Sequence, residues 1–252
     1  MATAPEHLTL RIVCPPPGKA GCLEVRAIVS GRDLLAEISG VVDAGPRLVG
    51  ETPRHLVAGP AAPLQAWATP HEVRLARTGC VEECCGALYV TVRRDGDHVV
   101  WTGWRNPVRK AVGLPELRFS ADQYEAEVGR AGADHDWEWP AETVARLLEA
   151  ALGEDEDWPA LWDCDLDAVW SARTEPDRID VVWRYPRGAA DTDRLWLQFG
   201  LTIEISAGDP SEQAKELAAR LTAGDPRAVA RVWGGTREAA EQYGYPWPPN
   251  HP

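Results

Sequence analysis

The chain has 252 residues, of which 44% are hydrophobic, enough for the packed core of one large domain or two small ones. Its formal net charge of −13 disfavours nucleic acid as a partner, because nucleic-acid binding rests on Lys and Arg side chains that neutralise phosphates. The sequence contains neither a run of about 18 apolar residues nor an export signal at its start, so we expect a cytoplasmic protein without membrane contact.

The first hundred residues alternate apolar and polar side chains, which is typical of strands with one buried face. Asp95 and Gly96 are suited to a tight hairpin turn, because Gly and Asp tolerate the backbone angles that such turns require. The stretch 41–64 is rich in Gly and Pro, which predicts a loop. The predicted strands are residues 8–14, 22–29, 34–39, 72–77, 87–93 and 98–104.

Helices are predicted in the middle of the chain. Ser120 and Gln123 have the spacing of a capping box, which predicts a helix that ends near Gly132. A second helix is predicted over residues 140–153, because Pro opens this stretch, apolar residues recur within it at helical spacing, and Gly closes it.

The last hundred residues mix both kinds of element. Two strands are predicted at residues 179–185 and 195–205. Two helices are predicted to start at Asp209-Pro210 and Asp225-Pro226, where Asp caps and Pro takes the first helical position. The fold class is therefore predicted to be α+β, with an antiparallel β-rich N-terminal half and helices concentrated in the C-terminal half. We place the boundary between a β-rich lobe, 1–110, and an α+β lobe, 111–252, and expect the two to pack as one compact unit.

Six cysteines in a cytoplasmic chain are expected to be free or metal-bound rather than paired in a disulfide framework. Cys14, Cys22, Cys80 and either Cys84 or Cys85 provide four thiolates for a possible zinc ion. The spacings are not those of common zinc sites, and small buried hydrophobic side chains are the alternative interpretation, so no cofactor is required. A redox role is disfavoured because the chain lacks a Cys-x-x-Cys pattern.

An acidic segment follows the helix at 140–153. Its densest part lies beside two of the twelve tryptophans, most of which we expect in the core. This combination suggests a negatively charged face with aromatic anchors for a basic protein partner. The alternative is a solvated acidic loop, and a calcium loop is disfavoured because Ala168 stands where such a loop requires Gly. The face would comprise Glu154, Asp155, Glu156, Asp157, Trp158 and Trp162.

A lone histidine, His135, lies between Asp134 and Asp136. Flanking carboxylates can orient a histidine as a general base or hold it protonated, so the three residues are candidate catalytic groups. The alternative is capping or surface pairing before the next helix. Signatures of phosphate-binding loops, zinc proteases, dinucleotide-binding loops and serine hydrolase elbows are absent from the sequence.

The segment 84–101 begins Cys84-Cys85-Gly86 and continues through the predicted hairpin to Trp101. It resembles a segment of uncharacterised proteins of high-GC bacteria, which have no assigned activity. The resemblance implies a bacterial cytoplasmic protein, and it transfers no catalytic or binding residue because the segment is a strand hairpin.

Three functional hypotheses follow. The first is a non-catalytic acidic protein-binding module, in the manner of an immunity or antitoxin protein that neutralises a basic toxin. The alternative is an enzyme acting on a small molecule with His135 and a neighbouring carboxylate as acid and base. The second alternative is a scaffold stabilised by zinc.

Overall fold

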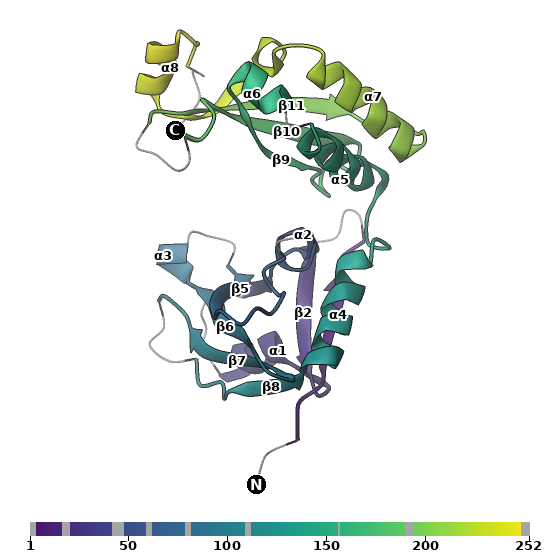
Figure 1. Ribbon diagram of the computed structural model, residues 1–252, viewed down its shortest axis with the longest axis vertical. Helices are drawn as coiled ribbons and strands as arrows, with labels where there is room; N and C mark the ends of the chain where they lie inside the picture. The colour runs from purple at the N-terminus through teal and green to yellow at the C-terminus, as the bar shows by residue number, and fades with distance from the viewer. Residues whose placement is uncertain are drawn as a thin grey trace. The chain divides into compact units, whose positions relative to one another are not determined.

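A computed structural model of the protein describes residues 4–16, 21–41, 48–58, 62–78, 82–108, 112–155, 157–189 and 194–247 (Figure 1). Its sheets are antiparallel and are combined with helices, which confirms the α+β class. The chain divides into two compact units, Met1–Trp137 and Glu138–Pro252, called here the first and the second unit. This division lies later than the predicted boundary after residue 110, because Phe119 and Tyr124 belong to the buried cluster of the first unit.

The first unit contains two sheets that share one core. A three-stranded sheet has the order β1-β2-β3, and a five-stranded sheet has the order β4-β5-β6-β7-β8. Backbone hydrogen bonds join the sheets at two places, from Val25 N to Glu51 O (2.7 Å) and from Glu6 N to Arg118 O (2.6 Å). The strands are β1 Leu8–Val13, β2 Glu24–Val29, β3 Arg32–Asp33, β4 Val49–Gly50, β5 His71–Arg77, β6 Ala87–Asp95, β7 His98–Arg105 and β8 Leu117–Ser120.

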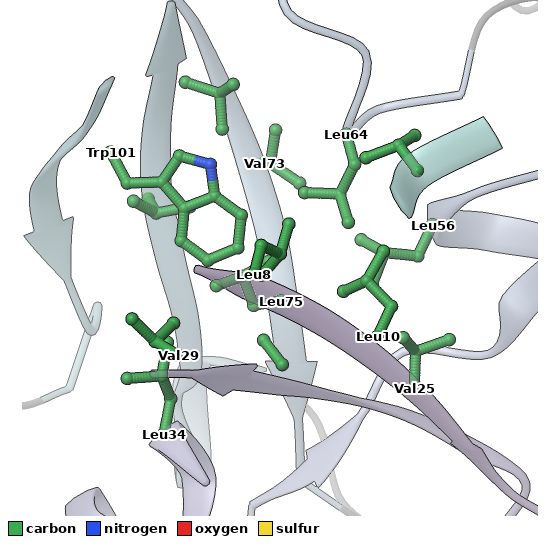
Figure 2. Packing of buried hydrophobic residues seen from close by; sticks show 14 of the residues in the cluster. Leu8, Leu10, Val25, Val29, Leu34, Leu56, Leu64, Val73, Leu75 and Trp101 are labelled. Atoms are coloured by element: carbon green, nitrogen blue, oxygen red, sulfur yellow. The ribbon is translucent and has the colours of Figure 1, made fainter. Parts of the chain in front are cut away.

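The core of the first unit is built from the inward faces of both sheets. Figure 2 shows Leu8 and Val25 of the smaller sheet in one buried cluster with Val73 and Trp101 of the larger one. All four side chains are at most 2% exposed. The alternation read from the sequence places these residues on the buried face, as period-two strands require.

Helix α4, Ala121–Ala133, confirms the predicted helix and buries Tyr124, Val128 and Ala131. The predicted capping box is wrong, because Ser120 makes no side-chain capping bond and Gln123 is used elsewhere. The Gln123 Oε1 atom accepts a hydrogen bond from Leu8 N (3.0 Å), and Gln123 Nε2 donates to Leu8 O (2.7 Å).

Two more side chains of α4 continue this pattern along β1. Glu127 Oε1 accepts from Leu10 N (2.6 Å), and Arg130 Nη2 donates to Leu10 O (2.7 Å). Strand β2 pairs with β1 on its other side. The polar side chains of α4 therefore take the place of a neighbouring strand at an edge that would otherwise present unpaired backbone groups.

The stretch 34–39, predicted as a strand, belongs to helix α1, Leu34–Val41. Asp33 explains the difference, because its Oδ1 atom accepts from Leu35 N (3.1 Å) and Ala36 N (3.2 Å) and so caps a helix start. The predicted loop at 41–64 also contains β4 and a short helix, α2, Pro53–Leu56. Another short helix, α3, spans Glu82–Cys85.

The second unit is a four-stranded sheet of order β12-β11-β10-β9 with its own buried cluster. Helix α5, Pro140–Gly153, has the predicted bounds and buries Val144 and Leu148 against the sheet residues Trp183 and Phe199. The other elements are α6 Asp157–Trp162, β9 Asp165–Trp170, β10 Arg178–Tyr185, β11 Leu197–Glu204, α7 Pro210–Thr222, β12 Arg231–Gly235 and α8 Arg237–Tyr243.

The helix predicted after Asp225-Pro226 is wrong. Asp225 caps only a single 3-10 turn, Pro226–Ala228, and the chain then enters β12. Val232 pairs with Phe199 of β11 and is buried in the core. The apolar residues after Pro226 have a spacing that would suit a helix, but pairing with the sheet outweighs this local preference. In the described part of the chain no helix is long and apolar enough to cross a membrane.

Candidate functional site

The acidic segment is partly exposed and partly structural. Glu154 and Asp157 are exposed, and neither forms an ion pair with any cation that the structure describes. Asp155 Oδ1 accepts from Trp158 N (3.0 Å) at the start of α6, so this carboxylate has a capping role. Glu156 lies outside the described residues.

The tryptophans of this segment do not form an exposed anchor, which corrects the predicted recognition face. Trp158 is 2% exposed, and its Nε1 atom donates to Leu221 O (3.2 Å) within the core of the second unit. Trp162 is partly buried against the same core. The apolar side chain that α6 does present to solvent is Leu161, which is 70% exposed.

The candidate catalytic residues Asp134, His135 and Asp136 lie in the connection that follows α4. Asp134 pairs with Arg130 (Oδ2 to Nη1, 3.5 Å), and its Oδ1 atom accepts from Asp136 N (3.1 Å). His135 and Asp136 are exposed. The structure therefore gives Asp134 a role in ending the helix, and it supplies no enclosed site around the histidine.

The cysteines proposed as zinc ligands are Cys14, Cys22, Cys80 and Cys84. Cys22 and Cys84 are exposed, Cys14 is partly buried, and Cys80 lies outside the described residues. Within the described ranges no three His, Cys, Asp or Glu side chains are grouped so that they could hold a metal ion.

The remaining cysteines are Cys85, which is not free as expected, and Cys164, whose thiol is unreactive. Cys85 is disulfide-bonded, so the expectation that the cysteines are free or metal-bound is wrong for this residue. Cys164 is buried, and burial raises the pKa of its thiol to about 12, although Arg227 acts in the opposite direction. A thiol that stays protonated near neutral pH is a poor nucleophile, so Cys164 has a packing role.

The first unit contains a cavity of about 520 Å³ beside α4. Helix α4 contributes Glu125, Val128, Gly129 and Gly132 to its lining. The other lining residues include Val57, at the end of α2, and the consecutive residues Gln65, Ala66 and Trp67. The cavity thus lies between a helix and an irregular segment that are about 60 residues apart in the sequence.

A buried hydrogen-bond relay holds residues 62–67, called here the wall segment, against α4. Trp101 Nε1 donates to the Tyr124 hydroxyl oxygen (3.1 Å), and this hydroxyl donates to Leu64 O (2.8 Å). Burial raises the pKa of Tyr124, so its hydroxyl keeps the proton that it donates. Leu64 N in turn donates to Leu56 O (3.3 Å) of α2. The core of the first unit therefore positions one side of the cavity.

Trp67 is the aromatic residue at the cavity, and its indole is 45% exposed. Its ring centroid lies 4.5 Å from that of His71, and its carbonyl oxygen accepts from Arg94 N (2.7 Å). The His71 ring is itself held by Pro63, whose carbonyl oxygen lies 2.7 Å from Nε2. A carbonyl only accepts, so Nε2 carries a proton in this bond. The ring contact with His71 and the backbone hydrogen bond from Arg94 thus hold Trp67 at the cavity.

Two glycines of α4 shape the cavity in different ways. A Cβ atom at Gly132 would lie 2.6 Å from Val57 O, so this glycine permits the close approach of α2 to α4. A Cβ atom at Gly129 would meet no atom within 4 Å. Glycine inside a helix costs about 0.5–1 kcal/mol relative to alanine. The packing of the protein explains Gly132 and does not explain Gly129.

Glu125 is the one titratable side chain among the described residues that line the cavity. It forms an ion pair with Arg94. A nucleophile, a general base and a general acid must stand within reach of one another in a hydrolytic or transfer site. The described lining contains no such group of side chains.

From the sequence alone, none of the lining residues is assigned to a functional site, although Gly132 is named as the end of a helix. The available signal was a pair of glycines three residues apart, Gly129 and Gly132, within an otherwise strong helical pattern. Glycine disfavours a helix, so a glycine within one calls for a reason in packing or function. For Gly129 and Gly132 that reason cannot be read until the position of the wall segment in the folded protein is known.

Comparison of the chain with protein-family models, curated proteins and solved structures found no match.

Proposed function

We propose that this protein is a non-catalytic binding protein and that the cavity beside α4 takes up a small apolar molecule. Its volume of about 520 Å³ falls within the range typical of small-molecule sites. Most lining residues are apolar, and Gln65 and Glu125 are the polar exceptions. Small-molecule sites commonly combine a mainly apolar surface with a few polar groups that fix the orientation of the ligand.

The observation that carries the proposal is the open space above Gly129. Alanine at this position would meet no steric obstacle and would favour the helix. Compared with alanine, glycine at this position makes the helix less stable and leaves its backbone uncovered within the cavity. A ligand that occupies this space accounts for the glycine, because any side chain there would compete with it.

The test is fragment binding monitored by NMR on isotope-labelled protein. We expect small apolar fragments to shift the amide signals of Gly129 and Gly132 and to lose this binding in Gly129→Leu, whose side chain fills the space. Ala126→Leu is the matched control, since Ala126 is an exposed residue of the same helix outside the cavity lining. The proposal fails if no fragment shifts these signals, or if Gly129→Leu binds as well as the control.

A second candidate function is the capture of a basic protein by the second unit, as expected for an immunity- or antitoxin-like protein. Residues 1–137 contain 15 Lys and Arg against 17 Asp and Glu, whereas residues 138–252 contain 11 against 22. The second unit thus carries −11 of the total charge of −13. Exposed Glu154 and Asp157 shortly precede exposed Leu161 in the sequence, so the segment offers an apolar side chain together with negative charge.

This second function is tested with a displayed library of Lys- and Arg-rich peptides, selected on the unaltered protein at about 50 mM salt. Peptides specific for the segment should bind about tenfold more weakly to the variant Glu154→Lys/Asp157→Lys. Asp155 is left intact because it caps α6. Glu238→Lys/Glu241→Lys makes the same charge change on exposed residues of α8. Equal losses in both variants would show general charge attraction and would contradict a defined face.

A further inference from the structure

We infer that the cavity beside α4 takes a planar aromatic ring that is neutral or positively charged, in preference to an aliphatic or an anionic group. This inference rests on the proposed binding function and specifies the ligand class of the same site. Three features of the lining lead to it: an exposed indole, an uncovered stretch of helix backbone and a carboxylate without a neighbouring cation in the lining.

The first feature is the indole of Trp67. It is 45% exposed and lines the cavity, while its contact with His71, at an interplanar angle of 48°, holds it in position. Aromatic pairs gain attraction beyond the area that they bury, because the face and the edge of each ring carry opposite partial charges. A ring that stacks on Trp67 should therefore bind about two- to tenfold more tightly than a saturated group of equal size.

The second feature is the surface that α4 contributes. Gly129 has open space where a side chain would stand, and Gly132 also lines the cavity. A helix surface without side chains at these positions allows a flat molecule to approach the backbone closely. The bulkier Val57 and Val128 provide apolar contacts for such a ring. A planar molecule is thus accommodated between the helix and the wall segment.

The third feature is charge. Glu125 lines the cavity, and none of the described lining residues is Lys, Arg or His. Arg94 pairs with Glu125 but is not itself a lining residue. A carboxylate ligand would therefore approach the Glu125 carboxylate and lose its hydration without a cation among the described lining residues. A ring N–H group, in contrast, finds acceptors in the Glu125 carboxylate and the Gln65 amide oxygen.

The test compares three probes by NMR titration: indole, the saturated bicyclic alcohol norborneol, which is close to indole in size, and indole-3-acetate, which adds an anionic side chain to the same ring. We expect indole to bind about two- to tenfold more tightly than norborneol and at least about tenfold more tightly than the anion. Trp67→Leu, which keeps an apolar side chain, should weaken indole to the level of norborneol and should weaken norborneol less than indole. Trp67→Phe retains a ring and should restore most of the affinity for indole.

The matched control is Trp196→Leu, because Trp196 is an exposed tryptophan of the second unit, outside the cavity lining, and its loss should change none of the three affinities. The inference about the ligand class is overturned if norborneol binds as tightly as indole and Trp67→Leu affects both alike. That outcome leaves the cavity as a binding site. If none of the probes shifts Gly129 or Gly132 in the unaltered protein, the proposed function fails as well.

Discussion

The two units each bury a tryptophan at the centre of a sheet, but they use its indole N–H group differently. Trp101 and Trp183 are both 0% exposed. In the first unit Trp101 donates to Tyr124, which passes the bond on to Leu64 of the wall segment. In the second unit the Trp183 Nε1 atom has no hydrogen-bond partner among the described residues. The buried tryptophan of the first unit thus supports the wall segment as well as a core, whereas that of the second unit only packs.

The same contrast extends to charge. The first unit is close to neutral and contains the cavity, while the second unit carries most of the negative charge. The tryptophans that made the acidic segment look like a recognition face are turned inward, and Leu161 is the apolar group left outside. The two proposed functions, uptake of a small molecule and capture of a basic protein, are therefore assigned to different units, so substitutions can test them separately.

The largest expected effect comes from removing the central tryptophans. Trp101→Ala and Trp183→Ala should each lower the free energy of unfolding by about 3–5 kcal/mol, because each leaves a large cavity in a core. Trp101→Ala should be the more damaging of the two, since it also removes the donor of the Tyr124 relay. Hydrogen exchange measured separately for the residues of each unit checks this. A larger loss for Trp183→Ala would contradict the proposed difference between the units.

A smaller effect on stability is expected from removing the Tyr124 hydroxyl group, the middle member of the hydrogen-bond relay. Tyr124→Phe leaves Leu64 O and Trp101 Nε1 without their buried partner and should cost about 1–3 kcal/mol. The control is Tyr243→Phe in the second unit, where a partly buried hydroxyl donates to Leu195 O (2.9 Å) and water can replace it. Urea unfolding gives both values, and equal losses would argue against a special role for the relay. Tyr124→Phe should also weaken indole binding.

The response to acid allows one carboxylate from each unit to be compared, Glu127 and Asp225, because the pKa of each is lowered by folding. Burial is the largest single influence and disfavours the charged form of each carboxylate. It is outweighed by the combined effect of the side-chain hydrogen bond and positive charge of Arg130 or Arg227 and a backbone N–H donor. A lowered pKa means that the carboxylate adds stability at pH values above its unfolded pKa of about 4. This contribution disappears as the pH falls through the folded pKa.

We therefore expect Glu127→Gln to make the first unit less sensitive to acid between about pH 5 and pH 2, and Asp225→Asn to do the same for the second unit. The measurement is the urea midpoint as a function of pH, followed by signals from each unit. Glu241→Gln, which changes an exposed carboxylate of α8, serves as the control. An acid slope that is the same in Glu127→Gln and in the control would refute the assignment.

The smallest expected effect is a gain in stability. Gly129→Ala should raise the free energy of unfolding by about 0.5–1 kcal/mol, because alanine favours the helix and meets no obstacle. The same change should weaken indole binding, since the new methyl group enters the cavity. Gly153→Ala in α5 is the control, because a Cβ there also meets open space but lies outside the cavity lining. Unchanged indole binding in Gly129→Ala would contradict the assigned role of this glycine.

Much of the secondary structure could be predicted because it depends on local periodicity. The alternation in β6 and β7 and the apolar stripe of α5 appear where the sequence places them. The failures occur where one contact outweighs the local pattern. Asp33 caps α1 in a stretch that looks like a strand, and pairing of Val232 with Phe199 turns a helical pattern into β12.

The candidate site was beyond prediction for a different reason. Its two sides, the wall segment and α4, are distant in the sequence and are joined by the hydrogen bond from Tyr124 to Leu64 and by packing in one buried cluster. Conversely, Trp158 and the acidic residues next to it are adjacent in the sequence, yet the core of the second unit takes the tryptophan away from the surface. Adjacent positions in the sequence therefore do not predict which residues of a short helix share its exposed face.

Composition and side-chain periodicity along a few residues were sufficient to predict the fold class and most helices and strands, and the net charge follows from composition alone. Contacts between distant segments were needed to learn which tryptophans are buried, which polar side chains of α4 complete the edge of β1, and where a cavity remains. These features depend on how distant segments fill space together, since close packing and the pairing of buried polar groups are conditions on the whole unit.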